Sequence, residues 1–516
     1  MTTSVKKRFF VSFFSNGLRS VMSFLAGLVV ARGLGPSDYG QLMFLLGSFV
    51  SIRSLLDLGT SNAFYTFIAQ AKRPLRYYSY YLLWLAFQFL LTAAVVGLLL
   101  PGEFLKHVWL GQERTVILLA FMASFFQQQL WQAVNQIGEA SRKTVRVQFL
   151  NLALALTYLA GVYALTHYGA ISVRRVLDLM ILQYLAAGLA AFRVLGPAAR
   201  DIGQEQVTPS EMFRKYRDYC APLAALSLAT FFYDFADKWM LQRFGGAIQQ
   251  GFYQVSYQFA VISILATTSI LNIFWKEIAE STKNEDGERV KRIFRKVSRG
   301  LYMFSAVVSG FLIPWSGEIV RVFLGEQYSS AGPVLALMFV YPIHQSLGQV
   351  ASVMLLAGER TAQYLKISVF FMLLSLPVSY LMQAPSSGVV PGFGLGAMGM
   401  SVKMVFLNIL SVNALLWLIA RNHNWKFEFS YQFVAVGVMF AAGFLVKLAA
   451  LRVYSGPPPA DKVHLASLFL VSGLVYVAAA YGVLRAFPGL AGLDKGELEG
   501  YIRKIRLPAP QGPARI

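Results

Sequence analysis

Long runs without a charged residue constrain this chain more than any other feature of its sequence. Tyr81–Leu100 is one such run, with twenty consecutive residues that carry no charge. As a helix, about 20 apolar residues cross the ~30 Å hydrocarbon core of a bilayer. Charged residues make up 14% of the chain and hydrophobic residues 56%, whereas soluble domains are about 25% charged. The sequence therefore predicts an all-α polytopic membrane protein.

Apolar windows separated by glycines, prolines and charge clusters divide the 516 residues into about fourteen predicted transmembrane helices. The predicted spans are 8–34, 39–69, 78–100, 115–140, 145–168, 176–195, 216–243, 251–281, 296–325, 331–357, 363–384, 395–420, 431–452 and 463–486. The loops between them are too short to hold a soluble domain.

A polar segment after the sixth span, with Pro197 and Pro209, predicts a linker between two lobes. Glycine-rich turns before an aromatic residue, GLGPSDYGQL and RFGGAIQQGFYQV, form a weak internal echo that favours two repeats. The predicted parts are a six-helix lobe over 1–195, a cytoplasmic linker over 196–215, a six-helix lobe over 216–420, two additional helices over 421–486 and a cytoplasmic tail over 487–516. The lobes are expected to surround a central cavity.

The tail has an amphipathic pattern beside basic residues. Leu498, Tyr501, Ile502 and Ile505 share one helical face, with Arg503 among the interleaved cations. This pattern predicts a short helix on the anionic inner leaflet, and a disordered basic tail is the alternative.

The basic residues indicate orientation. The chain has 46 Lys and Arg against 25 Asp and Glu, a net charge of +21. Of these 46 cations, 32 fall in segments on the same side as the N-terminus and 10 on the opposite side. Cytoplasmic loops carry such an excess, so both termini are predicted in the cytoplasm and no nucleic acid is needed to explain the charge.

Several function classes lack their motifs. The single cysteine, Cys220, excludes a disulfide within one chain, a Cys-rich metal site and a CxxC redox pair. The sequence has no GxxxxGK[ST] phosphate loop for an ATPase, and no metal-ligand cluster or DxD motif points to a glycosyltransferase. We therefore expect a transporter that holds no cofactor.

Ionisable residues at membrane depth mark functional sites by default. Arg19 lies at the centre of the first span and shares a face with Asn16; it either faces a substrate or holds a buried structural partner. Arg53 and Asp57 lie four residues apart in the second span, where an internal ion pair is the alternative to a site role.

The fourth span has an uncharged polar stripe. Gln128, Gln132 and Asn135 belong to it, followed by Gln136 and Glu139. Such amides either bond neighbouring helices or line a wet cavity and contact sugar hydroxyls. The length of the stripe favours the cavity.

The seventh span adds Asp234, Asp237 and Lys238, and Lys403 lies in the twelfth span. Asp234 and Lys238 are spaced to pair, which leaves Asp237 to bind a coupling proton or sodium ion, with Asp57 and Asp234 as further candidates. Arg19, Arg53, Lys238 and Lys403 outnumber the three carboxylates. A surplus of cations at low dielectric predicts an anionic cargo.

The segment ARGLGPSDYGQL (31–42), together with the acidic-Gly step LLDLGTSNAF, resembles the polysaccharide-transporter flippases. This is the oligosaccharide branch of the superfamily that includes multidrug exporters and the peptidoglycan-precursor flippase. The run DKWMLQRFGGAIQQGFYQVSYQF is similar to the entry into that family's second lobe. The span count, the linker and the basic tail also match.

The resemblance implies a flippase that moves a polyprenyl-pyrophosphate-linked oligosaccharide across a bacterial cytoplasmic membrane. It implies membrane lipids, glycosyltransferases and a polymerase of the same pathway as partners. Arg19 and Arg53 occupy positions similar to cavity arginines of the family, and the correspondence of Lys238 and Lys403 is looser.

Two alternatives stay open. A multidrug exporter of the same superfamily would use Asp57, Asp234 and Asp237 to bind organic cations. A membrane polysaccharide polymerase or ligase would need a substantial outer loop, and no predicted outer loop is long.

Overall fold

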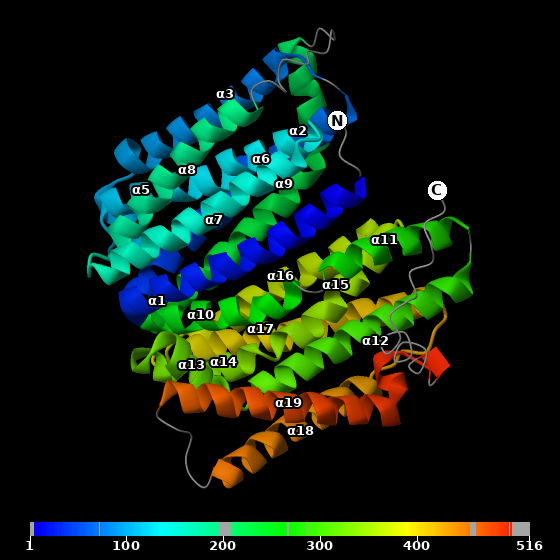
Figure 1. The fold of residues 1–516 in the computed structure, drawn as a ribbon. Helices are drawn as coiled ribbons and strands as arrows, with labels where there is room; N and C mark the ends of the chain where they lie inside the picture. Colours follow the sequence, from blue (N-terminus) through cyan, green and yellow to red (C-terminus); the bar gives the residue numbers. More distant parts are fainter. Residues whose placement is uncertain are drawn as a thin grey trace, which may run out of the picture. The chain divides into compact units, whose positions relative to one another are not determined.

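The computed structural model describes residues 5–71, 73–195, 208–265, 268–284, 286–454, 461–494 and 496–497 (Figure 1). Every regular element within these ranges is a helix, which confirms the predicted all-α class. By close packing the chain divides into two compact units, residues 1–255 with 372–400 and residues 256–371 with 401–516.

The first unit contains most of the predicted site residues. Its complete elements are α1 (Val5–Asp57), α2 (Thr60–Gln70), α3 (Leu75–Ala94), the π-helix η1 (Val95–Leu99), α4 (Gly102–Val108), α5 (Arg114–Phe125), the π-helix η2 (Phe126–Leu130), α6 (Trp131–Ala140), α7 (Thr144–His167), α8 (Val173–Leu195), α9 (Pro209–Met240) and the π-helix η4 (Leu241–Gly245). The helices α10 (Gly246–Leu265), α16 (Thr361–Gln383) and α17 (Gly396–Asn422) each contribute part of their length.

The first two predicted spans are divided at other positions than the sequence-based boundaries, because the chain bends at Gly35 and breaks at Leu58 and Gly59. The 53-residue α1 bends at Gly35, whose φ of 76° and ψ of 169° are open to glycine alone. The predicted second span, 39–69, breaks at Leu58 (φ 44°) and Gly59 (φ 87°), so its polar half ends α1 and its remainder forms α2. This break turns the chain directly after Asp57.

The predicted linker over 196–215 is shorter in the structure. Residues 196–207 lie outside the described part of the chain, and α9 already begins at Pro209. Thr208 and Glu211 form a capping box that starts this helix. The hydrogen bonds from Thr208 lower the pKa of the exposed Glu211 carboxyl. Because α9 packs on α1 and α2, it groups with residues 1–195, unlike in the predicted lobes.

The first unit packs around α1, which contacts α5, α7, α8 and α9, and side chains of neighbouring segments fit closely against its glycines. A Cβ atom on Gly33 would lie 3.0 Å from Ile171 Cδ1, and one on Gly161 would lie 2.9 Å from a Leu179 methyl carbon. Helices in lipid have no hydrophobic force between them, so such tight packing supplies much of their attraction.

The second unit is built on α12. Its elements are α11 (Thr268–Lys283), α12 (Gly287–Leu312), α13 (Ser316–Leu324), the 3₁₀-helix η5 (Glu326–Ala331), α14 (Gly332–Met338), α15 (Tyr341–Ala357), α18 (Ser430–Tyr454), α19 (Lys462–Ala486) and the 3₁₀-helix η6 (Pro488–Ala491), with the remaining parts of α10, α16 and α17. α12 packs against α11, α15 and α18. Tyr302 and Met303 of α12 are buried in the core cluster of this unit.

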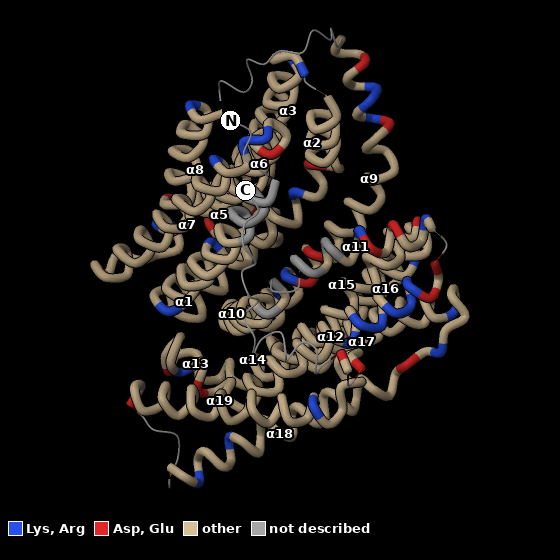
Figure 2. The backbone as a smooth tube through the Cα atoms, turned by 45° about the vertical axis from the view of Figure 1, so that its right-hand side comes forward, with Lys and Arg blue, Asp and Glu red and all other residues tan. Residues whose placement is uncertain are grey.

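Among the described residues, ten helices are long and apolar enough to cross a membrane, or eleven if α12 and α13, bent by 72°, form one span. This number is lower than the predicted fourteen, partly because two continuous helical stretches, of 44 and 54 residues, exceed a single crossing. In Figure 2, Lys, Arg, Asp and Glu gather mostly toward helix ends and loops. The molecule is a multi-pass membrane protein. The predicted tail helix at 498–506 lies outside the described residues.

Candidate substrate site

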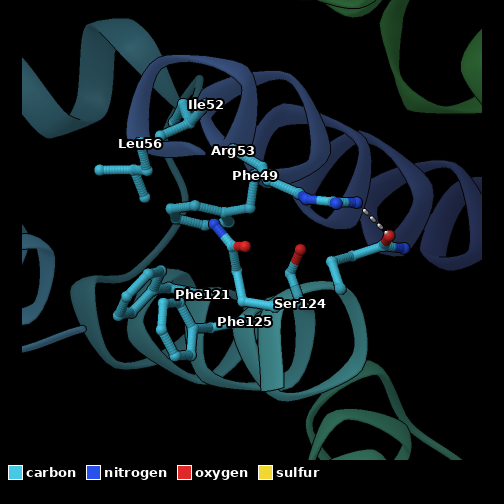
Figure 3. Close-up of a pocket in the computed structure, with 9 residues that line it drawn as sticks. Phe49, Ile52, Arg53, Leu56, Phe121, Ser124 and Phe125 are labelled. Carbon is cyan, nitrogen blue, oxygen red and sulfur yellow. Dashed lines mark hydrogen bonds between the residues drawn. The ribbon is translucent and has the colours of Figure 1, made fainter. Parts of the chain in front are cut away.

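Arg53 is the centre of the best-defined polar site in the first unit (Figure 3). It projects from the second half of α1, where Nη1 donates a 3.0 Å hydrogen bond to Gln128 Oε1. Nη2 donates a second hydrogen bond to Gln132 Oε1. Two neutral amides therefore hold both ends of the guanidinium.

Asp57 does not neutralise this charge by a direct contact. Its carboxylate accepts hydrogen bonds from Thr60 Oγ1 (3.0 Å), Ser61 N (2.8 Å) and Ser61 Oγ (2.7 Å) at the start of α2. Within the described part of the chain, no ion pair joins Asp57 to Arg53. The ion-pair interpretation is wrong because the break at residues 58 and 59 places the first turn of α2 over the carboxylate.

Two glutamines that the sequence analysis missed support the Arg53 site. Gln88 Nε2 donates to the Leu56 carbonyl at 2.7 Å, and Gln129 Nε2 donates to Gln88 Oε1 at 3.5 Å. Gln129 and Gln128 both lie in η2, and π-helical turns are frequent at functional sites. The signal for Gln129 in the sequence was the run of three consecutive glutamines, 127–129.

The rest of the polar stripe bonds neighbouring helices. Gln136 Nε2 donates to the Ser61 carbonyl at 3.2 Å. Asn135 accepts a 2.8 Å hydrogen bond from Asn151 Nδ2 of α7 and so does not join the Arg53 site. The expectation of one continuous cavity lining is thus not met. Because the chain breaks between α1 and α2, Arg53 of α1 bonds Gln128 and Gln132, and Ser61 of α2 bonds Gln136.

A small pocket adjoins Arg53. It is lined by Phe49, Ile52, Arg53, Leu56, Phe121, Ser124, Phe125, Gln128 and Gln129 (Figure 3). It has room for about one water molecule. A saccharide cannot enter it in this conformation, so any large cargo must meet Arg53 from another side or after a rearrangement.

Lys238 of α9 lies against the same half of α1. Its Nζ donates to Ser51 Oγ at 3.1 Å and to the Asp234 carbonyl at 3.2 Å. Its side chain also lies beside Gly47, where a Cβ atom would be 2.7 Å from Lys238 Cδ. These bonds replace the expected Asp234–Lys238 ion pair. The partner Ser51 lies two residues before Arg53 in α1, so Lys238 lies near Arg53.

Asp237 lies in a separate polar contact of the first unit. Its side chain is 9% exposed, and Oδ1 accepts a 2.5 Å hydrogen bond from Ser379 Oγ of α16. Ser375 and Gln383, one turn to either side on α16, each carry a buried oxygen without a hydrogen-bond partner. The bond between Asp237 and Ser379 thus links α9 to α16 in the protein interior.

Arg19 remains a cation that the packing does not neutralise. It is half-buried in the first half of α1. Within the described residues it has no hydrogen-bond or ion-pair partner. Asn16, one turn earlier, is exposed.

Lys403 belongs to the second unit and is 1% exposed. The four predicted cations are therefore divided between the two units, with Arg19, Arg53 and Lys238 in the first unit and Lys403 in the second. Among the described residues, no three His, Cys, Asp or Glu side chains come close enough to hold a metal ion.

The fold and these side chains together define a class: a helical multi-pass membrane protein with arginine, lysine and amide groups at membrane depth, as transporters have. The model of the family described as "Polysaccharide biosynthesis protein" matches residues 5–275. The chain belongs to this family, which confirms the resemblance noted from its motifs. No curated protein sequence matches the chain.

Several solved membrane transporters have a similar fold. The lipid II flippase MurJ in an inward closed conformation aligns with a TM-score of 0.64 at 14% identity, over 92% of this chain and 99% of that one. An inward-facing multidrug resistance MATE transporter of the MOP superfamily gives 0.60 at 14%, over 78% and 94%. A MOP superfamily transporter from Pyrococcus furiosus gives 0.53 at 13%, over 80% and 94%. At these identities the likeness shows the fold, that of MOP superfamily transporters.

Proposed function

We propose that this protein is a flippase that moves a polyprenyl-pyrophosphate-linked oligosaccharide from the inner to the outer leaflet of the bacterial cytoplasmic membrane by alternating access. The product would serve cell-surface or extracellular polysaccharide synthesis. Membership of the polysaccharide biosynthesis family supports this proposal. The observation that carries it is that neutral glutamines, and not a carboxylate, hold the Arg53 guanidinium.

The Arg53 guanidinium is held by two neutral glutamines, and the nearest carboxylate in sequence is bonded to Thr60 and Ser61 instead. A cation held in this way keeps its attraction for an anion. At an effective dielectric of ~20, opposite unit charges 4 Å apart attract by about 4 kcal/mol. A planar guanidinium also matches phosphate oxygens with two parallel hydrogen bonds.

An exporter of organic cations would need the opposite polarity. Asp57 is already occupied by three hydrogen bonds from Thr60 and Ser61, and Asp237 is bonded to Ser379. Arg53 and Arg19, by contrast, have no ion-pair partner in the described part of the chain. This polarity favours the lipid-linked saccharide over the organic cation.

The test is translocation in proteoliposomes of a fluorescent saccharide carried on a polyprenyl pyrophosphate. Arg53→Gln should lower the rate roughly 10- to 100-fold, the value of one or two charge-assisted hydrogen bonds. Arg53→Lys should retain part of the rate, and Arg174→Gln, at an exposed arginine of α8, should leave it unchanged. Wild-type rates in Arg53→Gln would remove Arg53 from the mechanism. Export of an organic cation in place of the saccharide would favour the exporter.

The membrane and partners follow from the same proposal. Both termini would lie in the cytoplasm, as the excess of Lys and Arg on that side favours. Glycosyltransferases would supply the lipid-linked oligosaccharide and a polymerase would use it after translocation. Asp237, hydrogen-bonded to Ser379 of α16, would bind a coupling proton or sodium ion.

A further inference from the structure

The two halves of the first unit are related by a repeated glycine pattern. Gly35 in α1 has φ 76° and ψ 169°, and Gly246, which begins α10, has φ 80° and ψ 174°. Each therefore makes the same sharp bend, and we call these two residues the elbow glycines. Gly40 and Gly251 follow the elbow glycines by the same number of residues.

The second glycine of each pair touches the other elbow. A Cβ atom on Gly40 would overlap the carbonyl oxygen of Ala247, far inside the 3.0 Å limit of real Cβ atoms. A Cβ atom on Gly251 would overlap the carbonyl oxygen of Pro36 in the same way. Ala247 and Pro36 each directly follow an elbow glycine, so the two contacts are equivalent. We name this pair of contacts the glycine crossing of α1 and α10.

The glycine crossing is tight but is not bonded. Among the described residues, no hydrogen bond or ion pair links Pro36 or Gly40 to Ala247 or Gly251. The helices can therefore separate there without leaving a polar group unsatisfied. The π-helix η4 directly precedes Gly246, and such turns and glycines are the positions at which helices bend.

A second glycine contact, in the other unit, differs in this respect. A Cβ atom on Gly443 of α18 would overlap the Gly310 carbonyl oxygen of α12. Lys447 Nζ of α18 donates to the carbonyl of Pro314, just after α12, at 2.6 Å. A polar bond thus fastens this contact, whereas no hydrogen bond joins the four residues of the glycine crossing in the described part of the chain.

We infer that the glycine crossing is an outer seal that closes in this conformation and opens during each transport cycle. The inference rests on the proposed function and orientation, since a cytoplasmic N-terminus places the elbow glycines on the outer face. Glycine at positions 40 and 251 permits the closed state, because any side chain there would hold the backbones apart. Alanine at either position should shift the protein toward the outward-open state.

The shift can be measured without any substrate. In a Cys220→Ser background, a reporter Ser23→Cys on the exposed face of α1 is labelled by a membrane-impermeant maleimide added outside. Gly40→Ala or Gly251→Ala should raise the labelling rate about fivefold or more, the change that a bias of ~1 kcal/mol produces. The double variant should add little, because either substitution alone already opens the glycine crossing.

Gly17→Ala is the matched control, since a Cβ atom at that position of α1 meets nothing within 4 Å. If Gly40→Ala and Gly251→Ala fold and label at the control rate, the seal is disproved. If the labelling shifts but no lipid-linked saccharide moves in the wild type, the proposed cargo is wrong and the seal stands.

A second measurement keeps the native glycines and does not depend on the folding of the alanine variants. Spin labels at Arg32→Cys and Arg243→Cys, each three residues before an elbow glycine and each exposed, report the separation of the elbows by pulsed electron resonance. We expect two distance populations in lipid nanodiscs, whose ratio changes between acidic and neutral pH or with sodium. A single narrow distance under all these conditions would overturn the inference.

Discussion

At the scale of single residues, the environment of each polar side chain decides its role more than its identity does. Arg53 and Arg19 lie on the same helix, yet Arg53 is held by Gln128 and Gln132 while Arg19 has no such partner in the described part of the chain. Holding the guanidinium in place lowers the entropic cost of binding an anion. Arg53 is therefore preorganised, and Arg19 is free to reach toward a moving headgroup.

Arg19→Ala should abolish translocation of the lipid-linked saccharide and leave expression intact, since no described side chain depends on Arg19 for a hydrogen bond. Arg19→Lys should retain part of the rate, because lysine keeps the charge but loses the planar fork. The measurement is the proteoliposome rate alongside the yield of monodisperse protein. Normal transport by Arg19→Ala would remove this residue from the mechanism.

Substitution of Asp237 tests whether transport is coupled to an ion. An imposed proton or sodium gradient should accelerate wild-type transport, and Asp237→Asn should make the rate insensitive to that gradient. A bound ion can drive the cycle only through different affinities in the two conformations. Ser379→Ala, which removes the hydroxyl that donates to Asp237, should shift the ion concentration that gives half the effect. If neither gradient changes the wild-type rate, coupling through Asp237 is wrong.

At the scale of helices, a buried ion pair is among the polar links that fasten α18 to the second unit. Lys447 Nζ lies 2.8 Å from Glu318 Oε1 of α13, with side chains 17% and 9% exposed, and 5.0 Å from the ring centroid of the buried Trp315. The additional helix α18 is thus an integral part of this unit. Its position does not depend on apolar contact alone.

Removing one partner of this pair should destabilise the protein strongly. Lys447→Met leaves Glu318 buried and unpaired, at a cost of about 3–5 kcal/mol, and should lower the thermal unfolding temperature in detergent. The double variant Lys447→Met with Glu318→Leu should be more stable than Lys447→Met alone, because no lone charge remains. Equal losses in the single and double variants would show that the ion pair does not hold α18.

At the scale of the whole molecule, the orientation of the chain is the property on which the proposed function depends most. In a Cys220→Ser background, a cysteine at the exposed Asp461 should react with an impermeant reagent from outside the cell. A cysteine at the exposed Glu359 should react after the membrane is opened. Reversed labelling would place the termini outside and contradict the proposed direction of transport.

The sequence by itself determined the class of fold, the family and the residue types of the site. Uncharged runs such as Tyr81–Leu100 admit few structures other than membrane helices, because hydrocarbon leaves backbone groups no partner but the helix itself. The rarity of charge in those runs made Arg53 and Asp237 conspicuous. Local pattern was sufficient for these conclusions because burial in lipid acts on each span independently.

Tertiary structure decided which of those residues meet. The spacing of Arg53 and Asp57 permitted an ion pair. Because the chain breaks at Leu58 and Gly59, Asp57 instead accepts hydrogen bonds from the start of α2, and Arg53 donates to glutamines. Gln88, from α3, joined the site without any local signal. The glycine crossing likewise depends on two segments more than 200 residues apart. Contacts between helices depend on bends and close approach, which one span's periodicity does not contain.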